Sequence, residues 1–226
     1  MASFRPFDMP MFFGRDLSRF FDFISVWYGE SPMLRTPSEL PVKILYPKDY
    51  LPTPNAAQSN LIDKFVKGLE SALQVKREEI SLAELWKRDC PDGPDHADIG
   101  EYLKLAGGYP YYRDSYYDLA AFREEYEEKH GKPPFVHRAM HWQWPLSILS
   151  GYASLNMSPM MRAPELTTII GEITYESTVT KRNEPLPIGA SVIGAPGTDL
   201  VLLDLVGKGM KAGGLPTKLK TGRFLY

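Results

Sequence analysis

The chain has 226 residues, of which 43% are hydrophobic and 24% charged, and its formal net charge is -2. This length and balance suit a single globular domain and exclude disordered or collagen-like chains. The weak net charge gives no long-range attraction to nucleic acid, and Cys90, the single cysteine, excludes an internal disulfide. Arg5 and Asp8 interrupt the start where a signal peptide needs an apolar run, and no run is long enough for a membrane helix. We therefore expect a soluble, cytoplasmic chain with no nucleic-acid or membrane partner.

The first part of the sequence predicts two helices with a short strand between them. The first helix is expected over 16–28 with Gly29 after it, and the strand over 41–47. Thr53 is expected to be the N-cap of the second helix, because proline follows it. Both helices carry apolar residues at three- and four-residue steps: Leu17, Phe20, Phe21, Ile24 and Trp27 in the first, and Leu61, Ile62, Phe65, Val66, Leu69, Ala72 and Leu73 in the second. Each stripe must pack against another element.

Three shorter helices are predicted from N-cap signals further along. Ser81 with Glu84, and Asp98 with Glu101, have the spacing of capping boxes. Asp118 is expected to cap a third helix that stops at Gly131. That helix has Leu119, Phe122 and Tyr126 on one face and Glu124, Glu125, Glu127 and Glu128 on the other, which we expect to be solvated.

The last third of the sequence predicts two strands and a helix after an irregular segment. Residues 132–163 are rich in proline and show no sustained period, although loops beyond about 15 residues are uncommon in compact domains. Residues 166–177 are rich in β-branched side chains and are expected to form a strand. Residues 188–193 are expected to form a second, buried strand. Pro196 and Gly197 are expected to make a turn, followed by a helix capped by Thr198 that runs from Asp199 to about Lys211 and stops at Gly213 and Gly214. The mixture of helices and strands predicts an α/β fold.

The turn at 194–199 could hold a phosphate or only reverse the chain. It matches neither the G-x-x-x-x-G-K-[ST] pattern nor G-x-G-x-x-G. Asp199 would also repel a phosphate from the start of the following helix. The structural interpretation is favoured.

Other candidate sites are equally weak. His137 and His141 have the spacing of two metal ligands on a helix, but Arg138 stands where the zinc-protease pattern has glutamate, so no metal or cofactor is expected. Cys90 has acidic neighbours that disfavour a thiolate nucleophile. Aromatic clusters at 109–112, 116–117 and 141–144 could line a groove for an apolar ligand or a partner chain, although core and loop packing is favoured.

One resemblance to a known family covers nearly the whole chain. The run GASVIGAPGTDLVLLDLV, with Leu186-Pro187-Ile188-Gly189 at its start, resembles the C-terminal strand, turn and helix of the amidase-signature family. FDMPMFFGRDLSRFFDFISVWYG, 7–29, is similar to the segment downstream of that family's nucleophile. YPKDYLPTP, FREEYEEKHGKPP and MSPMMRAPELTTIIGEITYES resemble its fungal-type branch.

The resemblance implies part of a mixed β-sheet flanked by helices, in a single partial domain over 1–226. Relatives hydrolyse carboxylic amides with a lysine base, a bridging serine and a nucleophilic serine in a Gly-Gly-Ser-x-Arg context, all N-terminal to the matched region. No residue here inherits a triad role: Gly107-Gly108 and Gly213-Gly214 precede Tyr109 and Leu215, where a nucleophile would stand. The resemblance therefore implies a chain that is inactive alone, with an amide as the substrate of full-length relatives.

Two further expectations follow from the resemblance. Longer relatives carry additional helical sequence where 141–144 and 147–151 nearly abut here, which indicates a deletion seam near 144–146. Met9, Phe12 and Phe13 are candidates for an apolar wall of the substrate pocket, although core packing is an alternative role. A partial domain exposes apolar surface, so self-association is expected. The alternative function is a non-catalytic binding protein for an apolar ligand or a partner chain.

Overall fold

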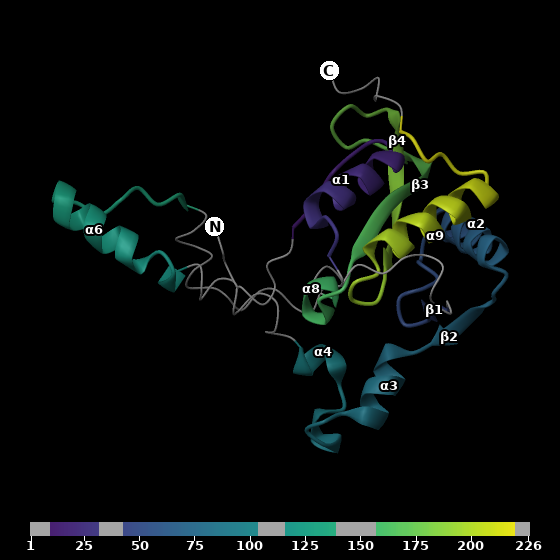
Figure 1. The fold of residues 1–226 in the computed structure, drawn as a ribbon, viewed down its shortest axis with the longest axis horizontal. Helices are drawn as coiled ribbons and strands as arrows, with labels where there is room; N and C mark the ends of the chain where they lie inside the picture. The colour runs from purple at the N-terminus through teal and green to yellow at the C-terminus, as the bar shows by residue number, and fades with distance from the viewer. Residues whose placement is uncertain (1–9, 32–42, 104–115, 139–156, 220–226) are drawn as a thin grey trace. The chain divides into compact units, whose positions relative to one another are not determined.

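The computed structural model describes residues 10–31, 43–103, 116–138 and 157–219 of the chain (Figure 1). Helices and strands are both present, which confirms the expected α/β class. Contacts between residues group the chain into two compact units, one made of 1–10 and 83–162 and the other of 11–82 and 163–226. The single partial domain over 1–226 stays a prediction, and the seam near 144–146 lies outside the described residues.

The described part of the first unit consists of short helices. Asp98 is the N-cap of one of them, and its side chain accepts hydrogen bonds from the backbone N–H groups of Gly100 and Glu101, as its capping box predicts. The expected N-cap at Asp118 is wrong, because the helix begins after Leu119 and has no side-chain cap. Gly131 ends that helix in a left-handed conformation, as predicted. The helices are α3 (Leu82–Asp89), which starts at the boundary between the units, η2 (Pro94–His96), α4 (Ile99–Tyr102), α6 (Ala120–His130) and α8 (Met157–Met161).

The second unit contains a strand–helix–strand motif. Strands β1 (Ile44–Pro47) and β2 (Arg77–Ile80) pair in parallel, and α2 (Ala56–Leu73) connects them. The expected N-cap at Thr53 is wrong: Asn55 is the N-cap and accepts from the N–H of Gln58 at 3.1 Å. The hydroxyl of Thr53 instead lies within hydrogen-bond distance of the carbonyl oxygen of Asn55 and of the Ser59 hydroxyl on the helix, so it does not cap the helix as the N-cap side chain would.

A long antiparallel hairpin forms the other sheet of this unit. Strands β3 (Glu165–Glu176) and β4 (Asn183–Ile193) pair along their whole length, with a bulge between Ile169 and Gly171. The strand expected to be buried at 188–193 is longer and only half-buried, since its exposed residues alternate with Ile188 and other inward-facing ones. This alternation is what a sheet covered on one face produces.

Three helices cover the inner face of the hairpin. Helix α9 (Asp199–Ala212) lies between α1 (Ser18–Tyr28) and α2 (Figure 1). The buried core contains side chains from α2, α9 and both strands, together with Leu17 just before α1, and includes Ile62, Phe65, Val66, Leu69, Leu166, Ile170, Ile188, Leu202, Leu203, Val206 and Met210. Phe20, Phe21 and Ile24 of α1 are partly buried and pack against it. The apolar stripes predicted for α1 and α2 therefore contribute to one core.

Small residues allow α2 and α9 to approach closely. A methyl group at Gly68 of α2 would lie 3.0 Å from the backbone nitrogen of Gly213. A methyl group at Gly209 of α9 would lie 2.9 Å from Cγ of Leu69. Both distances are shorter than an ordinary contact between carbon atoms, so the two backbones touch where side chains would separate them.

Thr198 stands before α9, but its role differs from the expected one. Its hydroxyl donates to the carbonyl oxygen of Ala195 at 2.6 Å and makes no cap to the helix. The N–H of Gly194 donates to the carbonyl oxygen of Pro164 at 2.9 Å, which fixes the end of β4 beside the start of β3. The turn at 194–199 thus reverses the chain by its own hydrogen bonds.

Candidate functional site

An aromatic strip lies along one side of α1, at the position of two predicted pocket residues. Phe12 stacks on Phe23 with ring centroids 3.9 Å apart, and its edge meets Phe20 at 4.8 Å. Phe23 in turn contacts Trp27 at 4.9 Å. Phe13 lies next to this strip with 82% of its surface exposed, and the third candidate, Met9, lies outside the described residues. The structure thus places Phe12 among stacked rings and leaves Phe13 accessible to a ligand.

The sequence reasoning named Phe12 and Phe13 but missed the residues that continue the strip. Phe23 and Trp27 are four residues apart on α1, and this spacing puts two side chains on one helical face. The apolar spacing of α1 predicts that Trp27 is buried, but in the structure it is exposed. The four-residue spacing was visible in the sequence, but periodicity does not tell which side of an aromatic-rich helix is buried.

Helix α1 is held against α9 and the segment after it. Leu17 is buried, and its N–H donates to the carbonyl oxygen of Thr217 at 3.0 Å. Asp16 pairs with Lys218, and the pKa of Asp16 is lowered, mainly because the Ser18 hydroxyl and N–H donate to its carboxylate. At the other end of α1, burial and the nearby Asp199 raise the pKa of the Tyr28 hydroxyl. The two helices are therefore antiparallel, with the aromatic strip anchored at both ends.

A second place of interest is the carboxyl edge of the parallel strands. Asp49, just after β1, accepts from the Ser81 hydroxyl at 2.7 Å and from the backbone N–H of Leu82. Ser81 thus precedes α3 as its capping motif predicts, but its hydroxyl is bound to a residue far away in the sequence. The only local signal for Asp49 was an acidic residue directly after an expected strand, and this does not reveal its partner.

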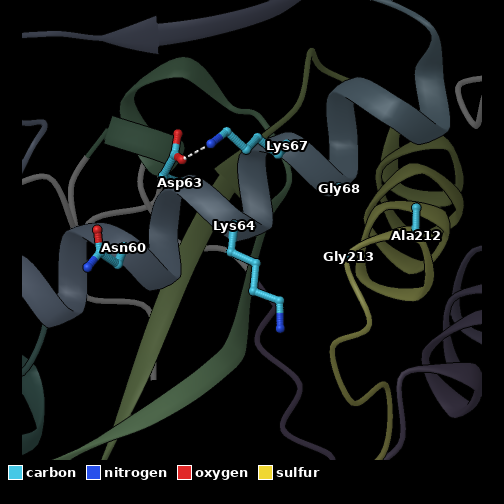
Figure 2. Close-up of a pocket in the computed structure, with 7 residues that line it drawn as sticks. All are labelled: Asn60, Asp63, Lys64, Lys67, Gly68, Ala212 and Gly213. Carbon is cyan, nitrogen blue, oxygen red and sulfur yellow. Dashed lines mark ion pairs between the residues drawn. The ribbon is translucent and has the colours of Figure 1, made fainter.

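An open depression of about 390 Å³ lies between α2 and the end of α9. It is lined by Asn60, Asp63, Lys64, Lys67, Gly68, Ala212 and Gly213 (Figure 2). Figure 2 shows Asp63 and Lys67 turned toward each other, at 2.7 Å, with Lys64 pointing away from them. The hydrogen bond from Lys67, with help from Arg77, lowers the pKa of Asp63. Asp63 and Lys67 neutralise each other, so among the lining side chains the excess charge is that of Lys64, which is positive.

The ion pairs beside this depression join α2 to β2. Arg77 donates from its backbone and side chain to the carboxylate of Glu70, at 2.9 and 3.1 Å, and reaches Asp63 at 3.0 Å. Its guanidinium also lies 5.2 Å from the ring centre of Tyr46 on β1. These hydrogen bonds lower the pKa of Glu70. Arg77 and Glu70 are largely buried, whereas Asp63 is 42% exposed. Every partner comes from the strand–helix–strand motif, so the network holds that motif together.

The other residues considered in the sequence are only partly described by the structure. The thiol of Cys90 donates to the carbonyl oxygen of His96 at 3.4 Å. His137 is described, whereas His141 and the aromatic clusters at 109–112 and 141–144 lie outside the described residues. In the third cluster Tyr116 meets Tyr117 edge-on, and Arg123 covers the Tyr116 ring at 4.1 Å. Within the described ranges, no three His, Cys, Asp or Glu side chains gather as a metal site would require.

No family model, curated protein or solved structure matches this chain. None of the helices that the structure describes is both long and apolar enough to cross a bilayer. The resemblance to the amidase-signature family rests on the sequence motifs alone, so what it implies for function is stated below as a proposal. The aromatic strip is the surface which that proposal concerns.

Proposed function

We propose that this chain forms the C-terminal part of an amidase-signature domain, where it supplies part of the sheet and one apolar wall of an amide-binding pocket. The observation that supports this is the contact between the two segments with the most specific resemblance. Helix α1 belongs to the first of these segments, 7–29, and α9 begins in the second, 189–206, and the two helices are in contact. Leu17 and Leu203 share one core, and a methyl at Gly207 would lie 3.5 Å from Leu17. Segments that are remote in sequence thus lie side by side.

A second part of the proposal is that the chain does not hydrolyse amides on its own. A serine hydroxyl attacks an amide only when a base takes its proton and N–H donors stabilise the oxyanion. The serine and lysine that do this in relatives have no counterpart at any matched position of this sequence. The pocket wall would therefore act in binding, with the reacting groups supplied from outside the matched region.

Hydrolysis by the purified chain tests this part. We expect no release of product from aliphatic amides or aryl anilides above the rate in buffer. Turnover that a serine-directed fluorophosphonate abolishes would show that the chain carries its own nucleophile, and the proposed division of roles would then be wrong.

Binding of an amide tests the pocket wall directly. The probe is the anilide of a medium-chain fatty acid, and its binding is followed by the change in tryptophan fluorescence. Phe13→Ser should weaken binding about tenfold or more, because burial of an aromatic ring contributes about 1.5–3 kcal/mol. The matched control is Phe135→Ser, since Phe135 is 89% exposed and belongs to the other unit. Equal affinities of the two variants, or no saturable binding by the parent chain, would contradict the pocket assignment.

The second candidate function is a non-catalytic protein that binds an apolar partner chain. The observation favouring it is the exposure of Met11, Phe13, Val26 and Trp27 around α1, with Val26 at 85%. Large apolar side chains exposed around one helix favour an interaction surface there. Self-association through this surface should appear in light scattering as a mass that rises with concentration, and Val26→Lys should reduce it. A constant mass that Val26→Lys leaves unchanged would exclude association through α1.

A further inference from the structure

The two outer edges of the β3–β4 hairpin are chemically different. On β4, Pro185 pairs with Thr174 and Pro187 pairs with Glu172. Proline has no N–H, so both prolines must occupy pairs whose backbone groups point away from β3. The outer edge of β4 therefore lacks two successive N–H donors. A strand cannot add to it with a regular ladder.

The same register sets the outer edge of β3. Alternate residues of an antiparallel strand point their N–H and C=O to opposite sides. Because Glu172 and Thr174 face the two prolines, their backbone groups point away from β4, as do those of Glu176. Within the described ranges β3 pairs with β4 and with no other strand. This edge thus presents a complete alternation of donors and acceptors.

The side chains along the β3 edge are of two kinds. Ile170 and Ile173 face the helices and belong to the core or pack against it. Glu172, Thr174 and Glu176 are exposed on the other face. An added strand would need apolar side chains beside the first group and polar ones beside the second.

Charge decides which strand fits. β3 contains Glu165, Glu172 and Glu176 and has no lysine or arginine. A second copy of β3, paired antiparallel about Thr174, would place Glu172 opposite Glu176, and like charges directly opposite each other are destabilising. We propose that the outer edge of β3 binds a strand of another polypeptide in which apolar residues alternate with lysine or arginine. The mode is addition of a strand to a sheet edge, with main-chain hydrogen bonds supplying affinity and charge supplying selectivity.

This inference stands on the hairpin and does not depend on the proposed amide pocket. If no peptide strand binds the β3 edge, amide binding that responds to Phe13→Ser still supports the pocket. If no amide binds, peptide binding at the β3 edge still supports strand addition. The two proposals are therefore tested separately.

The test uses a capped, fluorescein-labelled peptide, Val-Lys-Val-Thr-Val-Lys-Val, and its counterpart with glutamate in place of lysine. Fluorescence anisotropy should show that the lysine peptide binds the parent chain more tightly. Hydrogen exchange should show new protection of the amides of Glu172 and Thr174, with those of the β4 edge unchanged.

Matched variants separate the two edges. Thr174→Pro removes an outward N–H of β3 without removing a bond to β4, and should weaken binding of the lysine peptide by about tenfold. Asn183→Pro makes the same change on the outer edge of β4 and should leave binding unchanged. If Thr174→Pro impairs folding, the double variant Glu172→Lys with Glu176→Lys provides a second test, because it should reverse the preference toward the glutamate peptide.

Several results would overturn the proposal. They are equal binding of the two peptides, no binding of either, protection of amides elsewhere, or a preference that the charge reversal does not change. Protection of the β3 edge without any peptide would show that it is already covered, either by another segment of the chain or, where the mass doubles, by a second copy.

Discussion

Replacing Gly209 with alanine tests whether contact between the backbones of α2 and α9 holds this unit together. The new methyl would lie 2.9 Å from Cγ and 3.1 Å from Cα of Leu69, with Cδ2 closer still. Carbon atoms prefer separations of about 3.5–4.0 Å, so one helix must move or the buried Leu69 must leave its rotamer. Because Cα is backbone, a rotamer change relieves only part of the clash.

The magnitude follows from two opposing terms. Overpacking of a core costs about 1–3 kcal/mol, while alanine is favoured over glycine inside a helix by about 0.8–1.0 kcal/mol. We expect Gly209→Ala to lower the free energy of unfolding by up to about 2 kcal/mol, which at this chain length is a fall in Tm of up to about 8 °C.

Gly207 provides the matched control in the same helix. A methyl there would lie 3.5 Å from Cδ2 of Leu17, an ordinary contact, so the helix preference remains without a clash. Gly207→Ala should therefore raise Tm by up to about 4 °C. Thermal unfolding followed by far-ultraviolet circular dichroism measures both. If Gly209→Ala is as stable as Gly207→Ala, the close approach of the two helices is not as described.

Three further predictions concern polar contacts of the second unit. Glu70→Gln should destabilise the chain by about 1–2 kcal/mol, because the carboxylate is 10% exposed and bonded to Arg77. The matched control is Glu78→Gln, which should change stability by no more than about 0.5 kcal/mol because Glu78 forms an exposed ion pair. Equal losses of stability in urea unfolding would contradict this. The Glu70→Gln difference should shrink on acidification, since pairing lowers the pKa of Glu70 from its usual 4.5: its stabilisation is complete above that pH and is lost as the pH falls through the lower pKa of the folded state. A difference that stays constant down to pH 2 would exclude this assignment. Asn55→Ala should lower the free energy of unfolding by about 1 kcal/mol, because it removes the side chain that accepts from the N–H of Gln58. If Thr53→Ala lowers stability by as much, Thr53 acts as the cap and this assignment is wrong.

Local patterns in the sequence predicted the positions of α1, α2, α6 and α9, although the side-chain caps expected at Thr53, Asp118 and Thr198 are absent and α8 falls in a segment expected to be irregular. The apolar stripe of α2 placed Phe65 and Leu69 in the core, and Gly131 marked the end of α6, because a left-handed residue at that position favours glycine. These features depend on residues within one or two turns of each other, so a single sequence contains the information.

Features that depend on contacts between distant segments could not be predicted. The parallel pairing of β1 with β2 and the bond from Ser81 to Asp49 both depend on the path of the chain. The candidate site shows the same division: Phe12 and Phe13 were named from a resemblance, but the exposure of Trp27 follows only from the way α1 rests on α9.

The carboxyl edge of the parallel strands has a consequence for anion binding. In open α/β sheets this edge is where ligands commonly bind, often as an anion at the start of the next helix. Here the carboxylate of Asp49 already occupies the place of such an anion at the first amide of α3. The start of α3 is therefore already bound by a carboxylate of the same chain. Phosphate or sulfate in solution would have to displace that carboxylate, whose effective concentration is high because it belongs to the same polypeptide.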